Sequence, residues 1–272
     1  MLNLNEIYKP TTLADAVKFL QQPGAVALAG GTNLIAERRR DVRAVIDLSG
    51  LGLAYIREQS GAIALGAMTT LAALNDSPML RALANGIIAQ AAHRSVSSIL
   101  RNQATLAGTI IAEPDGIVAV ALLALDAQVV VMGTANRTIA LDAFLKELRE
   151  MRKSLVIEIV VPMANPRAAL HTVARTPSDQ PIVSVIASAQ IENQVARNVR
   201  IALGGVGEIA MRASAAEKML EAQMVNDALI ENAVGAMHAS PLHPRGDFRG
   251  SAEYRREMAM VLTRRAVREW IK

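Results

Sequence analysis

The chain has 272 residues, of which 51% are hydrophobic and 20% charged, so it is long and apolar enough to fold around a sizeable buried core. It contains no cysteine, which excludes disulfides, thiolate catalysis and any iron–sulfur or Cys-ligated zinc centre held by this chain itself. The net charge of +4 suits a phosphate-bearing ligand or an acidic protein better than nucleic acid, because only 3% of the residues are aromatic and stacking platforms are scarce.

Helix and strand signals alternate over the first fifty residues. Thr12 precedes apolar residues at helical spacing, and Pro23 with Gly24 closes the predicted helix. Strands are predicted at 26–29 and 44–48, with a short helical segment at 34–40 between them. This order predicts a compact α/β unit.

The next hundred residues continue to mix helices and strands. A buried helix is predicted at 118–125, because the run is apolar on every face. The remaining elements predicted here are a strand at 62–65, a helix from Thr70, a longer helix through 80–95, a strand-like run around Ile110, a strand at 128–132, a helix at 141–149 and a strand at 155–161.

Pro162 and Pro166 separate this region from a different one. We therefore expect a first domain over 1–165, with subdomains of about 1–54 and 55–165, and a second domain over 166–272. The second domain is expected to contain strands at 183–191 and 199–203, and helices across 213–237 and 251–271.

No stretch resembles an export signal or a membrane span. The longest strongly apolar stretch, 117–125, has nine residues, about half of the roughly 20 that cross a bilayer. We therefore expect a soluble, cytoplasmic protein with no membrane span.

The stretch "AVALAGGTNLIAERRR" (25–40) is the first candidate binding motif. A predicted strand leads into Gly30 and Gly31, where the absence of side chains permits positive φ and close approach of a ligand. Successive backbone N–H groups, with the side chains of Thr32 and Asn33, then offer a nest for an anion such as a phosphate. The alternative is a tight turn with a purely structural role.

The stretch "RNQATLAGTI" (101–110) is the second candidate. It combines small residues with hydroxyl groups, so it offers the second wall of a diphosphate site or, alternatively, a crowded structural turn.

Other motifs favour structural roles. The stretch "GGVGEIA" (204–210) matches the dinucleotide fingerprint G-x-G-x-x-A, but no following βαβ strand ends in an acidic residue. The four histidines show no metal-ligand spacing, and there is no G-x-S-x-G nucleophile motif.

Taken together, these segments resemble the FAD-binding medium subunit of the molybdenum hydroxylases, the family of xanthine, carbon monoxide, nicotinate and aldehyde dehydrogenases. "ALAGGTNLI" is similar to the family's first diphosphate loop, A-G-G-T-[ND]-L, and "RNQATLAGTI" to the second segment, R-N-x-[AG]-T-I-G-G-N-I. "VRIALGGVG" and "DFRGSAEYRREMAMVLTRRAV" resemble the C-terminal domain of these flavoproteins. The resemblance implies an α+β fold: a two-lobed FAD-binding domain of the vanillyl-alcohol-oxidase or PCMH type, then a smaller α+β domain with an antiparallel sheet plus helices.

The resemblance also implies roles for individual residues. One wall of the FAD diphosphate site would be the first loop, and the other would lie around the second. Asp115 would hydrogen-bond the ribose, and the backbone of Leu155 or Val156 would contact the flavin. The cofactor-binding residues implied are therefore Ala29, Gly30, Gly31, Thr32, Asn33, Leu34, Thr105, Ala107, Gly108, Thr109, Asp115, Leu155 and Val156. No catalytic or metal-ligating residue is implied.

The function implied is that of an electron-transfer flavoprotein subunit of an oxidoreductase. A large molybdopterin-binding partner with the molybdenum cofactor would oxidise the substrate, and a small partner with [2Fe-2S] clusters would deliver electrons to FAD here, from which an external acceptor takes them. The lack of cysteine agrees with clusters on another chain.

A second hypothesis rests on three departures from the family pattern. Ala107 and Thr109 stand where the family has glycine and asparagine, and Thr172 stands where it tends to carry a lysine. These residues suggest a non-catalytic scaffold or assembly homologue with weakened or lost FAD binding.

Overall fold

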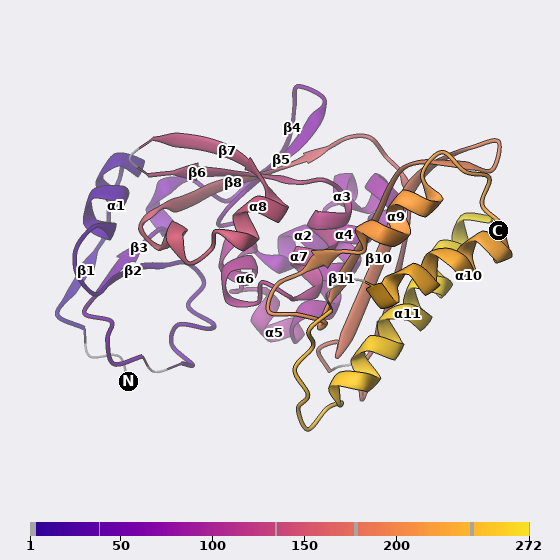
Figure 1. The fold of residues 1–272 in the computed structure, drawn as a ribbon. Helices are drawn as coiled ribbons and strands as arrows, with labels where there is room; N and C mark the ends of the chain where they lie inside the picture. Colours follow the sequence, from indigo (N-terminus) through magenta and orange to yellow (C-terminus); the bar gives the residue numbers. More distant parts are fainter. Residues whose placement is uncertain (1–3, 38, 134, 177–178, 240–241, 272) are drawn as a thin grey trace.

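The computed structural model describes the whole chain except residues 1–3, 38, 134, 177–178, 240–241 and 272. Within the described residues, three sheets follow one another along the chain (Figure 1). The first lies at the N-terminal end, the second in the middle beside a cluster of helices, and the third against the C-terminal helices.

The N-terminal sheet is parallel, with strand order β1-β3-β2. Thr12 caps helix α1 by accepting a hydrogen bond from the Asp15 amide at 3.1 Å, as its position before the apolar residues predicts. The elements are β1 Glu6–Tyr8, α1 Leu13–Leu20, β2 Ala25–Leu28 and β3 Ala44–Asp47. The predicted compact α/β unit is confirmed.

The helix predicted at 34–40 is wrong, because the described residues of this segment form hydrogen-bonded turns. The Ile35 amide donates to the Gly31 carbonyl and the Glu37 amide to that of Asn33, but no helix continues from them. The Ile35 side chain is 62% exposed, so an apolar face that would hold a helix against the core is missing.

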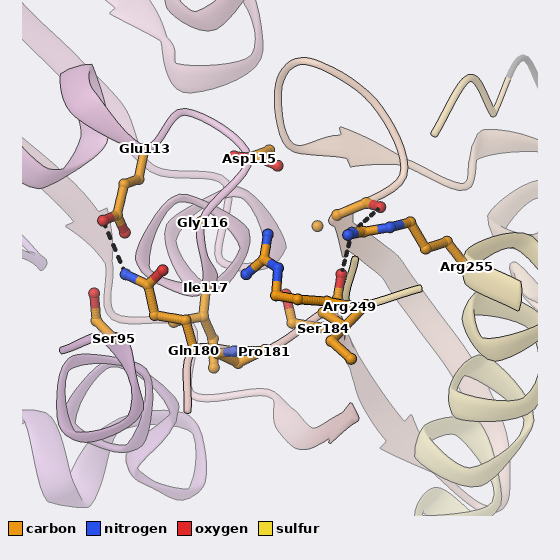
Figure 2. A pocket seen from close by; sticks show the side chains of 13 residues that line it. Ser95, Glu113, Asp115, Gly116, Ile117, Gln180, Pro181, Ser184, Arg249 and Arg255 are labelled. Atoms are coloured by element: carbon orange, nitrogen blue, oxygen red, sulfur yellow. Dashed lines mark hydrogen bonds between the residues drawn. The ribbon is translucent and has the colours of Figure 1, made fainter. Parts of the chain in front are cut away.

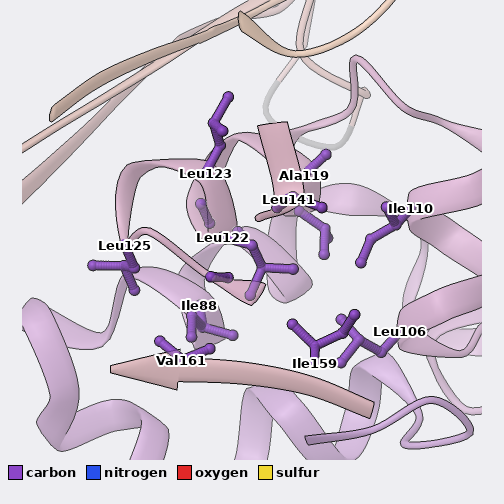
Figure 3. Close-up of a cluster of buried hydrophobic side chains, with 14 of the residues drawn as sticks. Ile88, Leu106, Ile110, Ala119, Leu122, Leu123, Leu125, Leu141, Ile159 and Val161 are labelled. Atoms are coloured by element: carbon purple, nitrogen blue, oxygen red, sulfur yellow. The ribbon is translucent and has the colours of Figure 1, made fainter. Parts of the chain in front are cut away.

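The second sheet is antiparallel, with strand order β4-β5-β8-β6-β7. Helix α7 is buried over its whole length, as its uniformly apolar sequence predicts, and it lies in the largest core with residues from the other helices and from β8 (Figure 3). The strands are β4 Ile56–Gln59, β5 Ala62–Gly66, β6 Gln128–Met132, β7 Asn136–Ala140 and β8 Leu155–Pro162. The helices are α2 Leu71–Asp76, α3 Pro78–Ala82, α4 Ile87–Ser95, α5 Ser98–Arg101, α6 Leu106–Ala112, α7 Ile117–Ala124 and α8 Leu141–Lys146, with 3-10 turns η1 Ser49–Leu51, η2 Leu83–Gly86 and η3 Glu150–Lys153.

Two expectations for this region are wrong. The long helix through 80–95 is broken, because Ala84, Asn85 and Gly86 all adopt left-handed backbone angles between α3 and α4. The Asn165 side chain accepts a hydrogen bond from the Ala84 amide at 2.7 Å and fixes this turn. The strand-like run around Ile110 is helix α6.

The third sheet is antiparallel, with strand order β12-β11-β10-β9, and helices cover it. This arrangement confirms the fold expected for the C-terminal part. The elements are β9 Arg167–Val173, β10 Val183–Glu192, β11 Val195–Gly204, β12 Met211–Arg212, α9 Ser214–Leu220, α10 Asp227–Ala236, η4 Met237–Ala239, α11 Ala252–Arg268 and η5 Glu269–Ile271.

Strand β10 is buried on both faces of this sheet. Val185 belongs to the core shared with α11, and Ile186 to the core shared with α7, as the alternation of side chains along a strand requires. The Ser188 hydroxyl on the α7 side donates to the Ala124 carbonyl at 2.6 Å. The C-terminal sheet is therefore joined directly to the helices of the middle region.

In the part of the chain that the structure describes, no single helix is long and apolar enough to cross a membrane. Helices α6 and α7 reach that threshold only together, and they are bent by 107° at the break between them.

Candidate cofactor-binding site

The first candidate loop leaves strand β2 and turns at Gly31, whose φ is +71°. Only glycine adopts this left-handed angle readily. Among the described residues, no group accepts a hydrogen bond from the backbone amides of 30–34, and the side chains of Thr32 and Asn33 also lack partners. The loop therefore presents a run of free donors, as a nest for an anion requires.

The second candidate loop runs from Gln103 into the start of helix α6. Thr105 precedes the helix, but its side chain does not cap it. Its hydroxyl is buried and has no hydrogen-bond partner, which is an uncommon state for a buried polar atom. The amides of Leu106 and Ala107 donate to the carbonyls of Thr69 and Ala67, whereas the Gly108 amide donates to no described group.

The two loops touch each other, although they are far apart in the sequence. A Cβ atom on Gly30 would lie 1.8 Å from the Gln103 carbonyl oxygen, and one on Gly108 would lie 3.8 Å from the Cβ of Ala29. Glycine at position 30 is therefore required for this close approach of the two backbones. The structure brings together the residues predicted from 29–34 and 105–109.

The start of β8 is tied to the second loop through Ala67. The Ala67 amide donates to the Ile157 carbonyl at 3.0 Å, and the Ala67 carbonyl accepts from the Ala107 amide at 3.1 Å. Leu155 and Val156, which directly precede Ile157, are both buried. Val156 belongs to the largest core, which includes residues of helix α6, whereas Leu155 packs in the core of the N-terminal α/β unit.

Asp115 lies apart from both loops, in the link between α6 and α7. It faces a cavity between the middle region and the C-terminal sheet, together with Glu113 (Figure 2). Burial raises the pKa of Asp115, against the attraction of Arg255 and Arg249. Burial also raises the pKa of Glu113, opposed by a hydrogen bond from Gln180 and reinforced by the nearby Asp115. Sequence reasoning gave no signal for Glu113, Arg249 or Arg255, because they come from segments that only the fold brings together.

Replacing Asp115 by asparagine is expected to stabilise the ligand-free protein at neutral pH. The pKa of Asp115 is higher in the folded protein than its ordinary value of 3.8, so folding favours the protonated carboxyl. The stability that this carboxyl contributes is complete in acid and is lost as the pH rises from 3.8 through the folded pKa. The free energy of unfolding should be measured with urea at a series of pH values. The excess stability of Asp115→Asn over the wild type should grow as the pH rises toward neutrality. A variant that is less stable than the wild type at neutral pH would contradict this account.

The structure shows what surrounds each of the three residues that depart from the family pattern. Ala107 is buried in the largest core, so its methyl group does not stand free on the surface of the loop. Thr109 is also buried. Thr172 accepts a hydrogen bond from the Arg94 guanidinium at 3.2 Å, so a cation from α4 stands beside this position.

The GGVG stretch has the structural role that its sequence context predicts. It ends the antiparallel strand β11 and leads to the short strand β12, not to a parallel βαβ unit. A Cβ atom on Gly205 would lie 2.0 Å from the Ile182 carbonyl oxygen, so this glycine permits a close backbone contact. In the described part of the chain, no group of three or more His, Cys, Asp or Glu side chains is arranged to hold a metal ion.

Comparisons over almost the full length relate the chain to known enzyme subunits. It is 27% identical to the glyceraldehyde dehydrogenase medium chain of Sulfolobus acidocaldarius, over 95% of each chain. It is also 27% identical to the carbon monoxide dehydrogenase medium chain of Hydrogenophaga pseudoflava, over 96% of this chain and 95% of that one. A solved structure of carbon monoxide dehydrogenase from H. pseudoflava, which lacks the Mo-pyranopterin moiety of the molybdenum cofactor, superposes with a TM-score of 0.90 at 27% identity and covers 97% of this chain and 96% of that one.

Two family descriptions divide the chain between them. Residues 3–164 match the FAD binding domain in molybdopterin dehydrogenase, and residues 168–270 match the CO dehydrogenase flavoprotein C-terminal domain. Fold and site thus define a class of protein, the two-part flavoprotein subunits of oxidoreductases. The chain belongs to the molybdenum hydroxylase family, as one of its FAD-binding medium subunits.

Proposed function

We propose that this chain holds FAD with its diphosphate between the loops 29–34 and 105–109, and that it transfers electrons from a partner's iron–sulfur cluster to an external acceptor. The observation that carries the proposal is the contact of the two loops at Gly30, which sets the free amides of the first beside the unpaired Gly108 amide. Backbone amides of this kind are suited to bind phosphate oxygens without a lysine or arginine.

The residues present fit the cofactor. The buried hydroxyl of Thr105 lacks a partner and would donate to a phosphate or ribityl oxygen. The side chains of Thr32 and Asn33 are unpaired and would add donors on the other wall. Asp115 would accept from the ribose, and the backbone at Leu155 and Val156 would contact the flavin. FAD supplies the redox chemistry when bound, while this chain binds and orients it.

The proposed partners are a large molybdopterin-binding subunit and a small subunit with [2Fe-2S] clusters. The relatives are named as medium chains of carbon monoxide and glyceraldehyde dehydrogenases, which supports assembly with other chains. Without cysteine, this chain has no thiolate ligand for a cluster, so the electron donor would reside on a partner.

Gly31→Val is expected to abolish FAD binding. The variant places a β-branched residue at a φ of +71°, which such residues rarely adopt. Its Cβ atom would also lie only 3.1 Å from the Ile35 side chain. Flavin absorbance after incubation with FAD and removal of the excess measures the loss.

Gly61→Val is the matched control, because Gly61 has a similar φ of +75° in a hairpin turn with open space around it. Gly61→Val should be less stable than the wild type because of backbone strain, but it should still bind FAD. Flavin retained by Gly31→Val would show that the diphosphate is bound elsewhere.

A further inference from the structure

Residues 67–71, which lead from β5 into α2, pair with the second loop of the proposed site. An isolated antiparallel bridge joins Thr70 to Thr105. Three backbone hydrogen bonds accompany the bridge. They run from the amides of one segment to the carbonyls of the other: Leu71 to Ala104 at 2.9 Å, Leu106 to Thr69 at 2.8 Å, and Ala107 to Ala67 at 3.1 Å. Residues 67–71, named the support segment from here on, therefore hold the second loop as a neighbouring strand would.

This pairing decides which donors of the second loop stay free. The first amides of a helix have no partner within the helix itself. In α6 the support segment accepts from the amides of Leu106 and Ala107, and the Thr109 amide donates to the Thr105 carbonyl. The Gly108 amide and the buried Thr105 hydroxyl are left without a partner among the described residues. A Cβ atom on Gly108 would lie 2.7 Å from Oγ1 of Thr105, so the two free donors are neighbours.

Thr69 fixes the support segment to the strand region before it. Its side chain is buried, and its hydroxyl binds the backbone of Tyr55 twice. The hydroxyl accepts from the Tyr55 amide at 3.1 Å and donates to the Tyr55 carbonyl at 2.8 Å. The Thr69 carbonyl in turn accepts from the Leu106 amide, so one residue connects the chain before β4 to the first turn of α6.

We propose that Thr69 is a positioning residue of the cofactor site. Its hydroxyl holds the support segment in place, and the support segment aims the Gly108 amide and the Thr105 hydroxyl at one phosphate group. Hydrogen bonds weaken steeply when donor and acceptor are misaligned, so a small shift of the second loop would cost affinity. This inference rests on the proposed function, because it takes the bound anion to be the FAD diphosphate.

The dissociation constant for FAD, measured by isothermal titration calorimetry on the whole chain, tests the inference. Thr69→Val keeps the shape of the side chain but loses both hydrogen bonds to Tyr55, and it should weaken FAD binding about tenfold. Thr69→Ser keeps the hydroxyl and should restore most of the affinity. Thr69→Ala takes the place of the valine variant if that variant does not fold.

Thr263→Val is the matched control. Thr263 lies in α11, is also buried, and donates its hydroxyl to the Ala259 carbonyl at 2.7 Å. This variant therefore loses a buried threonine hydroxyl in the C-terminal domain, and its affinity for FAD should equal that of the wild type.

Hydrogen exchange in the FAD-free chain reports the position of the second loop directly. In Thr69→Val, the amides of Leu106 and Ala107 should exchange about tenfold faster relative to the amides of the buried helix α7, which open only in larger unfolding events. In Thr263→Val this ratio should not change. A purely global loss of stability would instead raise both rates together.

The outcomes separate this inference from the proposed function. Equal FAD affinity in the wild type and Thr69→Val would overturn the role of Thr69 and leave FAD binding intact. The same conclusion follows if Thr69→Ser loses FAD as completely as Thr69→Val, because the hydroxyl would then not be the group that matters. A wild-type chain that binds no FAD would contradict the proposed function and, with it, the role of Thr69 in cofactor binding.

Discussion

Gly30→Ala should abolish FAD binding and lower the free energy of unfolding by about 3 kcal/mol. The added methyl carbon would lie 1.8 Å from the Gln103 carbonyl oxygen and 2.7 Å from its carbonyl carbon. Both are backbone atoms, so no side-chain rotation relieves the clash, and the two loops must separate. Urea denaturation measures the stability, and flavin absorbance after incubation with FAD measures the binding.

Gly235→Ala is the matched control for this substitution. Gly235 lies in helix α10, and nothing lies within 4 Å of the position that its Cβ atom would take. Because alanine favours the helix, this variant should be as stable as the wild type or more stable, by up to about 1 kcal/mol. If Gly30→Ala also kept wild-type stability and FAD binding, the close contact between the loops would not exist in solution.

Arg255→Met should lower the free energy of unfolding by about 1 to 3 kcal/mol, because it removes a buried guanidinium and leaves the carbonyls of Ile182 and Gly205 without their donor. Arg255 reaches from α11 to the carbonyl of Ile182 at 2.8 Å and to Asp247 at 2.9 Å, and so connects the last helix to the sheet and to the loop 243–250. Urea denaturation at neutral pH measures the loss.

The effect of Arg255→Met should also depend on pH. Burial alone would raise the pKa of Asp247, but hydrogen bonds from the Arg249 amide and from the side chains of Arg255 and Arg249 hold this pKa well below its usual range. A depressed carboxyl pKa contributes stability above the unfolded value of 3.8 that is lost as the pH falls. The difference between variant and wild type should therefore narrow in acid.

Arg256→Met, one position along the same helix, is the control. Arg256 is exposed, and its Nε donates a long hydrogen bond of 3.3 Å to the Leu242 carbonyl. It should change the free energy of unfolding by no more than about 0.5 kcal/mol. Similar losses in both variants would show that Arg255 acts only through general helix packing.

The elements that could be predicted from the sequence carry strong local signals. Helix α1 has a Thr12 cap and an apolar stripe, and α7 is apolar throughout. Strand β10 combines β-branched residues with burial on both faces. The two amide-rich loops could also be found, because Gly-Gly-Thr-Asn after a strand already limits the backbone to few conformations.

Elements that depend on tertiary contacts could not be predicted. Thr109, Ile110 and Ile111 favour a strand by local propensity, but Leu106 and Ile110, one helical turn apart, are both buried in the core, and this packing selects helix α6 (Figure 3). Strand β9 was missed because Ala168, Ala169 and His171 carry no strand signal without β10 beside them. The break at Ala84 depends on Asn165, which lies in a distant segment.

The cavity beside Asp115 could not be predicted from the sequence either, because it also depends on tertiary contacts. The sequence indicates Asp115 only as an isolated residue, and Arg249 and Arg255 lie more than a hundred residues further on, just before and within the predicted helix 251–271. Their convergence follows from the docking of α11 on β10 and of β10 on α7. A charge cluster of this kind becomes visible only once the sheet order is known.

The most direct measurement is the visible absorbance spectrum of the purified chain, incubated with FAD and then freed of excess cofactor by gel filtration. The protein is expected to stay yellow, with flavin bands near about 370 and 450 nm, in the wild type and in Gly235→Ala but not in Gly30→Ala. A colourless wild-type protein would contradict FAD binding between the two loops and would favour a scaffold or assembly role for this chain.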